Sequence, residues 1–155
     1  MIVRSLLAAA LTAVFVNSAA AETTAQIFQS FGLIGTWAVN CKAAASDSNL
    51  YMVFSAQPDG SVRREYFNGP KPHDTYQVDN AKVSGAKITF HTFDLNIPDR
   101  PYDIGPFDRE YYVDILLNDG QIRVWGMDHV YRGTLIADGR AIDSKIATEW
   151  QSKCR

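Results

Sequence analysis

The sequence predicts an all-β protein, an eight-stranded antiparallel up-and-down barrel with a short N-terminal helix. One interpretation of the last segment adds a short C-terminal helix. Short apolar segments recur at regular spacing, and turn signals such as Pro58-Asp59-Gly60 and Asn118-Asp119-Gly120 separate them. Crossover helices are lacking, so the strands are expected to pair antiparallel in a barrel or a sandwich. Closure removes unpaired strand edges, which favours the barrel.

Residues 1–21 have the pattern of a signal peptide. Arg4 supplies a positive charge, Leu6 to Val16 form an apolar run too short to span a bilayer, and Ala19-Ala20-Ala21 offers small residues for cleavage. We therefore expect cleavage after Ala21, which leaves residues 22–155 as a single barrel domain in the periplasm or the external medium. The alternative is a buried N-terminal helix.

A short helix is predicted at the start of the mature chain, over Thr23–Ser30. Thr23 can cap it, and Gln26, three residues later, can return a hydrogen bond to the cap. Ile27, Phe28 and Phe31 share one face, and Gly32 can end the helix in a left-handed turn. A helix this short needs another surface on which to bury its apolar face.

Strand character follows. In the third expected strand, Val62, Arg64 and Tyr66 alternate with Arg63, Glu65 and Phe67. After the last strand, Ile142, Ile146, Trp150 and Cys154 recur every four residues, which suits a helix better than a strand. The expected strands cover residues 33–40, 49–56, 61–67, 74–78, 86–93, 109–117, 121–128 and 130–137.

Export places the two cysteines, Cys41 and Cys154, in an oxidising compartment, where a lone pair is most simply a disulfide. This bond would join the first strand to the end of the chain. Loop-closure entropy gives it a stabilising effect of about 4–5 kcal/mol. A redox-active pair is disfavoured, because no Cys-x-x-Cys spacing is present to lower a thiol pKa.

Composition excludes some partners. The formal charge is -2 with no basic block, which argues against nucleic acid or anionic lipid as the main partner. No second apolar run reaches membrane length, so no integral membrane segment is expected once the signal peptide is removed. The apolar fraction of 46% is ordinary for a globular domain.

Gly35-Thr36-Trp37, placed after a short helix and at the start of the first strand, resembles the Gly-x-Trp signature of the lipocalins and their calycin relatives. The resemblance is to small exported bacterial barrels of this type. It implies that Trp37 packs across the closed end of the barrel and that a cation from a late strand covers its ring. Arg132 is the candidate for that cation, with Arg123 and Arg140 as alternatives.

Catalytic and metal-binding motifs are not found. The sequence has no Gly-x-Ser-x-Gly, no phosphate-binding glycine loop and no tight histidine pair, so we expect no catalytic residues, no metal and no cofactor. His73, His91 and His129, with Asp74, Asp94 and Asp128 near them in sequence, could assemble a zinc or copper site only across strands.

Two features could bind a ligand. Asp94–Asp108 is an acidic, proline-bearing connection, and long loops of this kind often carry function. Aromatic side chains could also line the barrel interior or simply fill it. The speculative ligand-binding residues are Tyr66, Tyr112, Trp125, Tyr102 and Phe107.

These features favour an exported, non-enzymatic barrel that binds a small apolar molecule inside or a protein at its rim. One alternative is an enzyme-inhibitor module that presents the Asp94–Asp108 loop or the N-terminal segment. Another is a small hydrolase that uses carboxylates from that loop.

Overall fold

A computed structural model describes residues 21–95 and 110–154. The predicted signal peptide, apart from Ala21, and most of the Asp94–Asp108 loop lie outside these residues. One helix and ten strands are described. They are α1 (Thr24–Phe31), β1 (Gly35–Ala38), β2 (Tyr51–Ala56), β3 (Val62–Phe67), β4 (Pro72–Ser84), β5 (Lys87–Asp94), β6 (Glu110–Asn118), β7 (Gln121–His129), β8 (Gly133–Ala137), β9 (Arg140–Ala141) and β10 (Gln151–Cys154).

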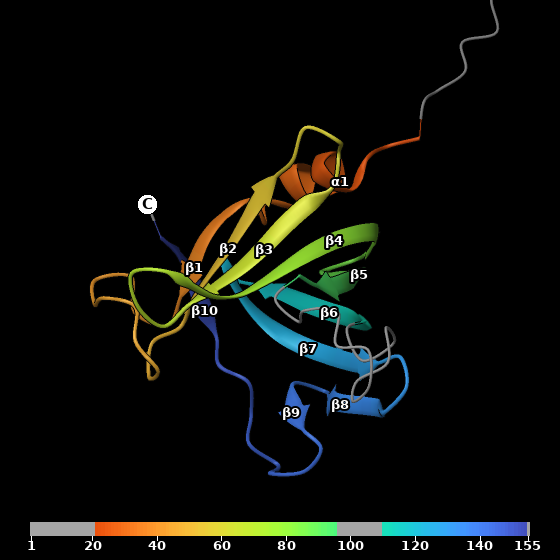
Figure 1. Cartoon of the computed structure of the whole chain (residues 1–155). Coiled ribbons are helices and arrows are strands. Elements are labelled where there is room, and N and C mark those ends of the chain that lie inside the picture. Colours follow the sequence, from red (N-terminus) through yellow and green to blue (C-terminus); the bar gives the residue numbers. More distant parts are fainter. Residues whose placement is uncertain (1–20, 96–109, 155) are drawn as a thin grey trace, which may run out of the picture.

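Eight of the described strands close into an antiparallel barrel, which confirms the predicted fold class. Strands β1 to β7 follow one another in chain order, and β10 lies between β1 and β7 (Figure 1). The closing contact is short: β10 pairs with β7 only through Gln151 with Ile122 and Ser152 with Gln121. The second half of β7 pairs with β8 instead, which with β9 forms an arm outside the ring.

The end of the chain differs from the prediction. The segment 130–137 was expected to be the eighth strand of the ring, but β8 belongs to the outer arm and β10 closes the barrel. The predicted short C-terminal helix over Ile142–Trp150 is not formed, because this segment consists of turns and an isolated bridge. Ile142 is 39% and Ile146 69% exposed, so their four-residue spacing buries no common face.

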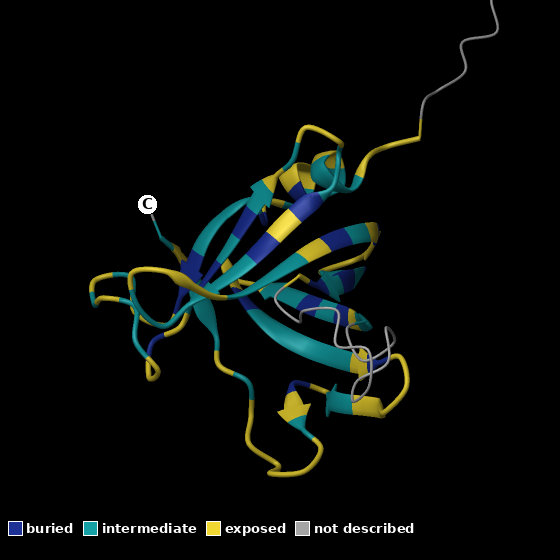
Figure 2. Cartoon of the chain, in the orientation of Figure 1, coloured by how far each residue is buried: buried dark blue, intermediate teal, exposed yellow. Residues whose placement is uncertain are grey.

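Helix α1 closes one end of the barrel. It begins at the predicted capping box, in which the Thr23 hydroxyl accepts a hydrogen bond from the Gln26 amide, and Gly32 ends it in the left-handed conformation. Phe28 is fully buried, with its ring 5.4 Å from that of Phe54 and 5.2 Å from that of Phe90. This aromatic cluster fills the helix end of the barrel. Figure 2 shows buried positions, in dark blue, along the strands of the ring.

Strand β4 is longer than predicted and carries a bulge. Its register against β5 shifts between Asp79 and Lys82, where Asn80 has a positive φ of 52°. The extra residue changes which positions face inward, so Val78 and Ala81 are both buried. Strand β4 packs against α1 and so helps to cover the helix end.

The disulfide between Cys41 and Cys154 is present, as predicted. Because β10 closes the ring, this bond fixes the last strand against the segment that follows β1. The bond therefore helps to keep the ring closed at β10, which pairs with β1 on one side and forms only the short ladder with β7 on the other.

Trp37 is buried, and its indole N–H donates a 2.8 Å hydrogen bond to the Leu33 carbonyl. The cation over its ring is Lys153, with Nζ 5.5 Å from the ring centroid, rather than Arg132. Arg132 lies in the exposed turn between β7 and β8. Gly35 explains the arrangement: its φ is 129°, and a Cβ there would lie 2.9 Å from Cε of Lys153, so glycine lets the lysine cross above Trp37.

Candidate functional site

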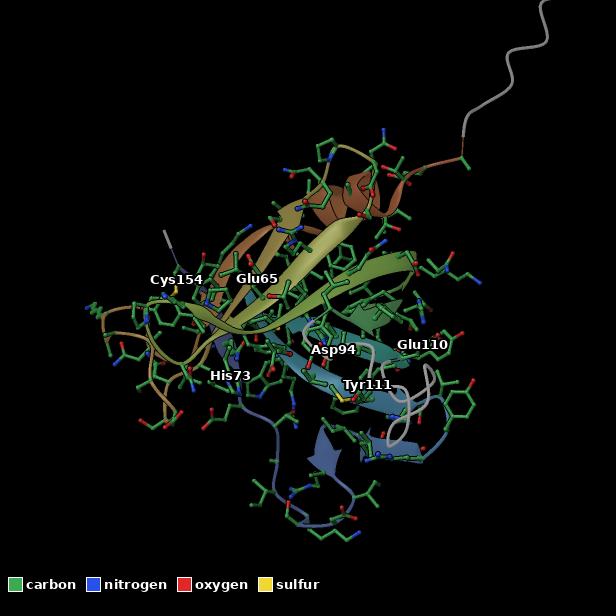
Figure 3. The ribbon with its side chains drawn as sticks, in the orientation of Figure 1. Glu65, His73, Asp94, Glu110, Tyr111 and Cys154 are labelled. Carbon is green, nitrogen blue, oxygen red and sulfur yellow. A yellow bond between two sulfur atoms is a disulfide. The ribbon has the colours of Figure 1, made fainter. Side chains whose placement is uncertain are left out.

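The interior of the barrel changes character between its two ends. Near α1 it is aromatic and aliphatic, whereas the opposite end, here called the mouth, contains buried polar residues. In Figure 3 the labelled Asp94 and Tyr111 lie on the side of the barrel away from α1. Buried polar groups are costly unless they have partners, so their concentration at one end needs a reason. The interior polar residues are Arg64, Thr92, Asp94 and His129.

Arg64 is the least expected of these residues. It follows Val62 by two positions on β3, so strand alternation turns both side chains inward, and Arg64 is only 1% exposed. Its guanidinium carbon lies 4.5 Å from the ring centroid of Tyr76 and 5.2 Å from that of Tyr66. No ion pair joins Arg64 to any carboxylate among the described residues, and its Nε and Nη1 have no hydrogen-bond partner there.

A line of aromatic rings runs across the mouth. Tyr66 meets Tyr76 edge to face at 6.1 Å, Tyr76 meets Tyr111 at 6.4 Å, and Tyr111 meets His129 at 5.0 Å. Edge-to-face pairs of this kind hold their rings in defined orientations. Burial raises the pKa of the Tyr76 hydroxyl, an effect that Arg64 partly opposes, so this hydroxyl stays protonated across the physiological range.

His129 fixes the turn that leads out of the ring. Its Nδ1 accepts hydrogen bonds from the backbone N–H groups of Tyr131 and Arg132, each at 3.1 Å. An Nδ1 that accepts two bonds places the proton of the neutral ring on Nε2. The imidazole therefore anchors the β7–β8 turn and, through its edge contact, orients Tyr111.

A cavity of about 210 Å³ opens at the mouth. It forms where β7 leaves the closed ring to pair with β8, so that Leu135 of β8 borders the interior residues of β3, β4, β6 and β7. Its lining combines one guanidinium, two phenol rings and two aliphatic or thioether side chains. The lining residues are Arg64, Tyr76, Tyr111, Met127 and Leu135. Larger hollows lie on the outer surface of the described structure, against strand turns and α1.

Of the three predicted ligand-binding residues that the structure describes, one lies beside this site. Tyr66 packs against Tyr76 beside the guanidinium of Arg64. Tyr112 is 51% exposed and contacts His91 on the outer face. Trp125 packs against Arg123 near the β8–β9 arm and is not among the residues that line the cavity. It is the residue that the β6–β7 ladder skips at its register shift, between the paired residues Val124 and Gly126. Tyr102 and Phe107 lie outside the described residues.

The histidines do not assemble a site. His91 pairs with Asp79 at 2.8 Å and Glu110 at 3.3 Å, whereas His73 lies 3.8 Å from Asp74. His129 uses its Nδ1 within the β7–β8 turn. Across residues 21–95 and 110–154, no group of three or more potential ligands gathers at one point to hold a metal ion.

Sequence reasoning missed Arg64, although the signal was present. The alternation Val62, Arg64, Tyr66 puts the arginine on the apolar face of its strand, and a charged residue on such a face marks an interior polar site. Met127 was among the residues expected to line an interior cavity, and it does so. Leu135 could not be assigned to the cavity, because its place depends on the branching of β7 between β8 and β10.

No family model matches this chain, and no curated protein or solved structure shows significant similarity to it. In the part of the chain that is described, the structure contains no helix of the length and apolar character needed to cross a membrane. The contacts within the mouth therefore carry the functional argument.

Proposed function

We propose that the protein is an exported, non-enzymatic barrel that binds a small molecule in the mouth cavity. The observation that carries this proposal is the hollow itself. It lies at the open end of an otherwise filled barrel, and aromatic and aliphatic side chains line it together with one buried charge. Binding sites for small molecules have this composition, mostly apolar with a few placed polar groups, and often occupy the mouths of barrels.

Binding is favoured over catalysis by the chemistry of the lining. A guanidinium and an aliphatic or thioether side chain are poor proton acceptors, and burial keeps Tyr76 in its neutral form. A general base or nucleophile near neutral pH would need a group with a different pKa. Among the described residues that line it, the cavity therefore offers positions for contacts and no group suited to proton abstraction.

The proposal that the chain is exported and lipocalin-like has separate support. A disulfide that closes the barrel is most useful in an oxidising compartment. Gly35 and Trp37, at the start of β1 and under a covering lysine, are the features on which the resemblance to lipocalins rests. The export part of this proposal can be tested by the intact mass of the secreted protein, which should lack residues 1–21.

Methionine methyl NMR tests the binding proposal. Met127 lines the cavity, whereas Met52 lies 2% exposed in the core, so the two methyl signals report on the site and on an internal control. Small aromatic compounds, neutral and anionic, should shift Met127 more than Met52. If no compound in such a set shifts Met127, the proposed function is wrong.

A cavity-filling variant supplies a second control. Leu135→Trp should occupy the hollow and abolish the Met127 shifts while the protein stays folded. Ile142→Trp places the same ring at an exposed position of the outer arm and should leave the shifts unchanged. Equal shifts in the wild type and in Leu135→Trp would place the binding elsewhere and contradict the proposal.

A further inference from the structure

The buried guanidinium of Arg64 indicates what kind of ligand the mouth takes. Moving a charged group out of water costs several kcal/mol unless a partner compensates, and buried arginines are accordingly paired in most proteins. Arg64 is 1% exposed, yet Nε and Nη1 have no hydrogen-bond partner in the described structure. Thr92, on the interior face of β5, is fully buried and its hydroxyl likewise lacks a partner there.

The aromatic rings around Arg64 do not replace such a partner. Tyr76 and Tyr66 stabilise the positive charge through their faces, with the guanidinium carbon 4.5 Å and 5.2 Å from the ring centroids. The five N–H donors of a guanidinium, however, lie in its own plane and need oxygen acceptors. The rings therefore hold the guanidinium in place, and its buried Nε and Nη1 donors stay unpaired in a side chain that borders the cavity.

Cavity size limits the ligand. Its volume of about 210 Å³ equals the share of about seven water molecules in liquid water. An apolar cavity of about 150 Å³ accommodates benzene. A single aromatic ring with a short polar arm therefore fits within the cavity. Met127 and Leu135 supply apolar contacts for the ring.

Charge limits the polar arm of the ligand. Arg64 is the one cation that lines the cavity in the described structure. A group with one negative charge balances this single positive charge, whereas a dianion would leave an excess of negative charge at a buried position. A carboxylate also matches the forked donors of arginine in shape and can accept two parallel hydrogen bonds.

We propose that the mouth binds a small monocarboxylate with a compact apolar body, held through a paired hydrogen bond between its carboxylate and the guanidinium of Arg64. This inference rests on the proposed function, because it names the ligand class of the same cavity.

Phenylacetate and phenylacetamide provide matched probes, because they differ in charge and hardly in shape. Calorimetric titration of the mature protein should show binding of phenylacetate at least about tenfold tighter than that of phenylacetamide. Phenylphosphonate, near pH 8 where it is a dianion, tests the charge limit and should bind more weakly than phenylacetate.

Variants of Arg64 test whether the guanidinium is responsible. Arg64→Met should weaken phenylacetate binding by about tenfold or more and leave phenylacetamide unchanged. Arg64→Lys keeps the charge without the fork and should give an intermediate affinity. Arg63→Met removes an exposed arginine from the same strand and should change neither affinity. Near-ultraviolet circular dichroism confirms that each variant is folded.

The outcomes separate this inference from the proposed function. If phenylacetamide and phenylacetate both shift Met127 with equal affinity, or if Arg64→Met binds phenylacetate as the wild type does, the carboxylate inference is wrong and small-molecule binding stands. If neither compound nor any other small aromatic probe shifts Met127, the proposed function fails as well. Tighter binding of phenylphosphonate than of phenylacetate would overturn the restriction to a single charge.

Discussion

The guanidinium of Arg64 lies 4.5 Å from the ring centroid of Tyr76, inside the barrel and directly across the β3–β4 ladder from it. The contact follows from the register of β3 against β4, because the two residues are paired in this ladder and both side chains point into the barrel. The contact orients the arginine and does not supply acceptors for its N–H donors. A residue placed in this way costs the fold stability and gives the cavity a fixed positive charge.

Arg64→Met should therefore raise stability. The substitution removes the desolvation cost of a buried charge and retains an unbranched apolar side chain, so we expect the free energy of unfolding to rise by about 1–3 kcal/mol. Loss of the contacts with Tyr66 and Tyr76 offsets part of this gain. Urea denaturation measures the change, and Arg63→Met serves as an exposed control. A large destabilisation by Arg64→Met would mean that the arginine has a structural partner.

Reduction of the Cys41–Cys154 disulfide should destabilise the barrel strongly. The bond spans 113 positions, and the entropy of closing such a loop corresponds to about 4–5 kcal/mol. The urea midpoint should fall when dithiothreitol is present. A Cys41→Ala/Cys154→Ala double variant should unfold at that lower midpoint with or without the reductant. An unchanged midpoint in the reduced wild type would show that the β10 ladder holds without the bond.

Phe28→Ala should cost about 3–5 kcal/mol, because it removes a fully buried ring from the contacts with Phe54 and Phe90. Gln29→Ala changes the next residue of α1, which is exposed, and should have little effect. Thermal unfolding monitored by circular dichroism compares the two variants. Equal stabilities would show that α1 rests on the barrel without closing it.

Lys153→Met tests the cation over Trp37. Lys153 also donates a 2.8 Å hydrogen bond to the Gly32 carbonyl, so its loss should lower the free energy of unfolding by about 0.5–1.5 kcal/mol. Arg132→Met should leave this free energy unchanged within about 0.5 kcal/mol, because Arg132 is exposed in the β7–β8 turn. If chemical denaturation shows a larger loss of stability for Arg132→Met than for Lys153→Met, Lys153 is not the cation that stabilises Trp37.

Local patterns predicted the parts of the fold that depend on local physics. The capping box of α1, most ring strands and the hairpin turns follow from propensity, alternation and turn residues near one another in the chain. The disulfide followed from two cysteines in a chain with a predicted signal peptide. Ring closure did not follow, because β7 divides its edge between β10 and β8, and this choice depends on long-range packing.

The candidate site was predictable only in part. Tyr66 was identified as an aromatic residue of an inward face, and Arg64 shares that face, but a lone arginine in a strand gives no sign that its donors lack partners. Lys153, rather than Arg132, covers Trp37 because β10 pairs directly with β1, so that Lys153 is the neighbour of Trp37 in the ladder. This neighbour relation exists only once the ring closes through β10.

A crystal structure of the mature protein with para-bromophenylacetate tests the central claim most directly. We predict anomalous bromine density within the mouth cavity, near Met127 and Leu135, and both carboxylate oxygens about 2.7–3.0 Å from guanidinium nitrogens of Arg64. Water alone in the cavity, or bromine bound only on the outer surface, would contradict the account.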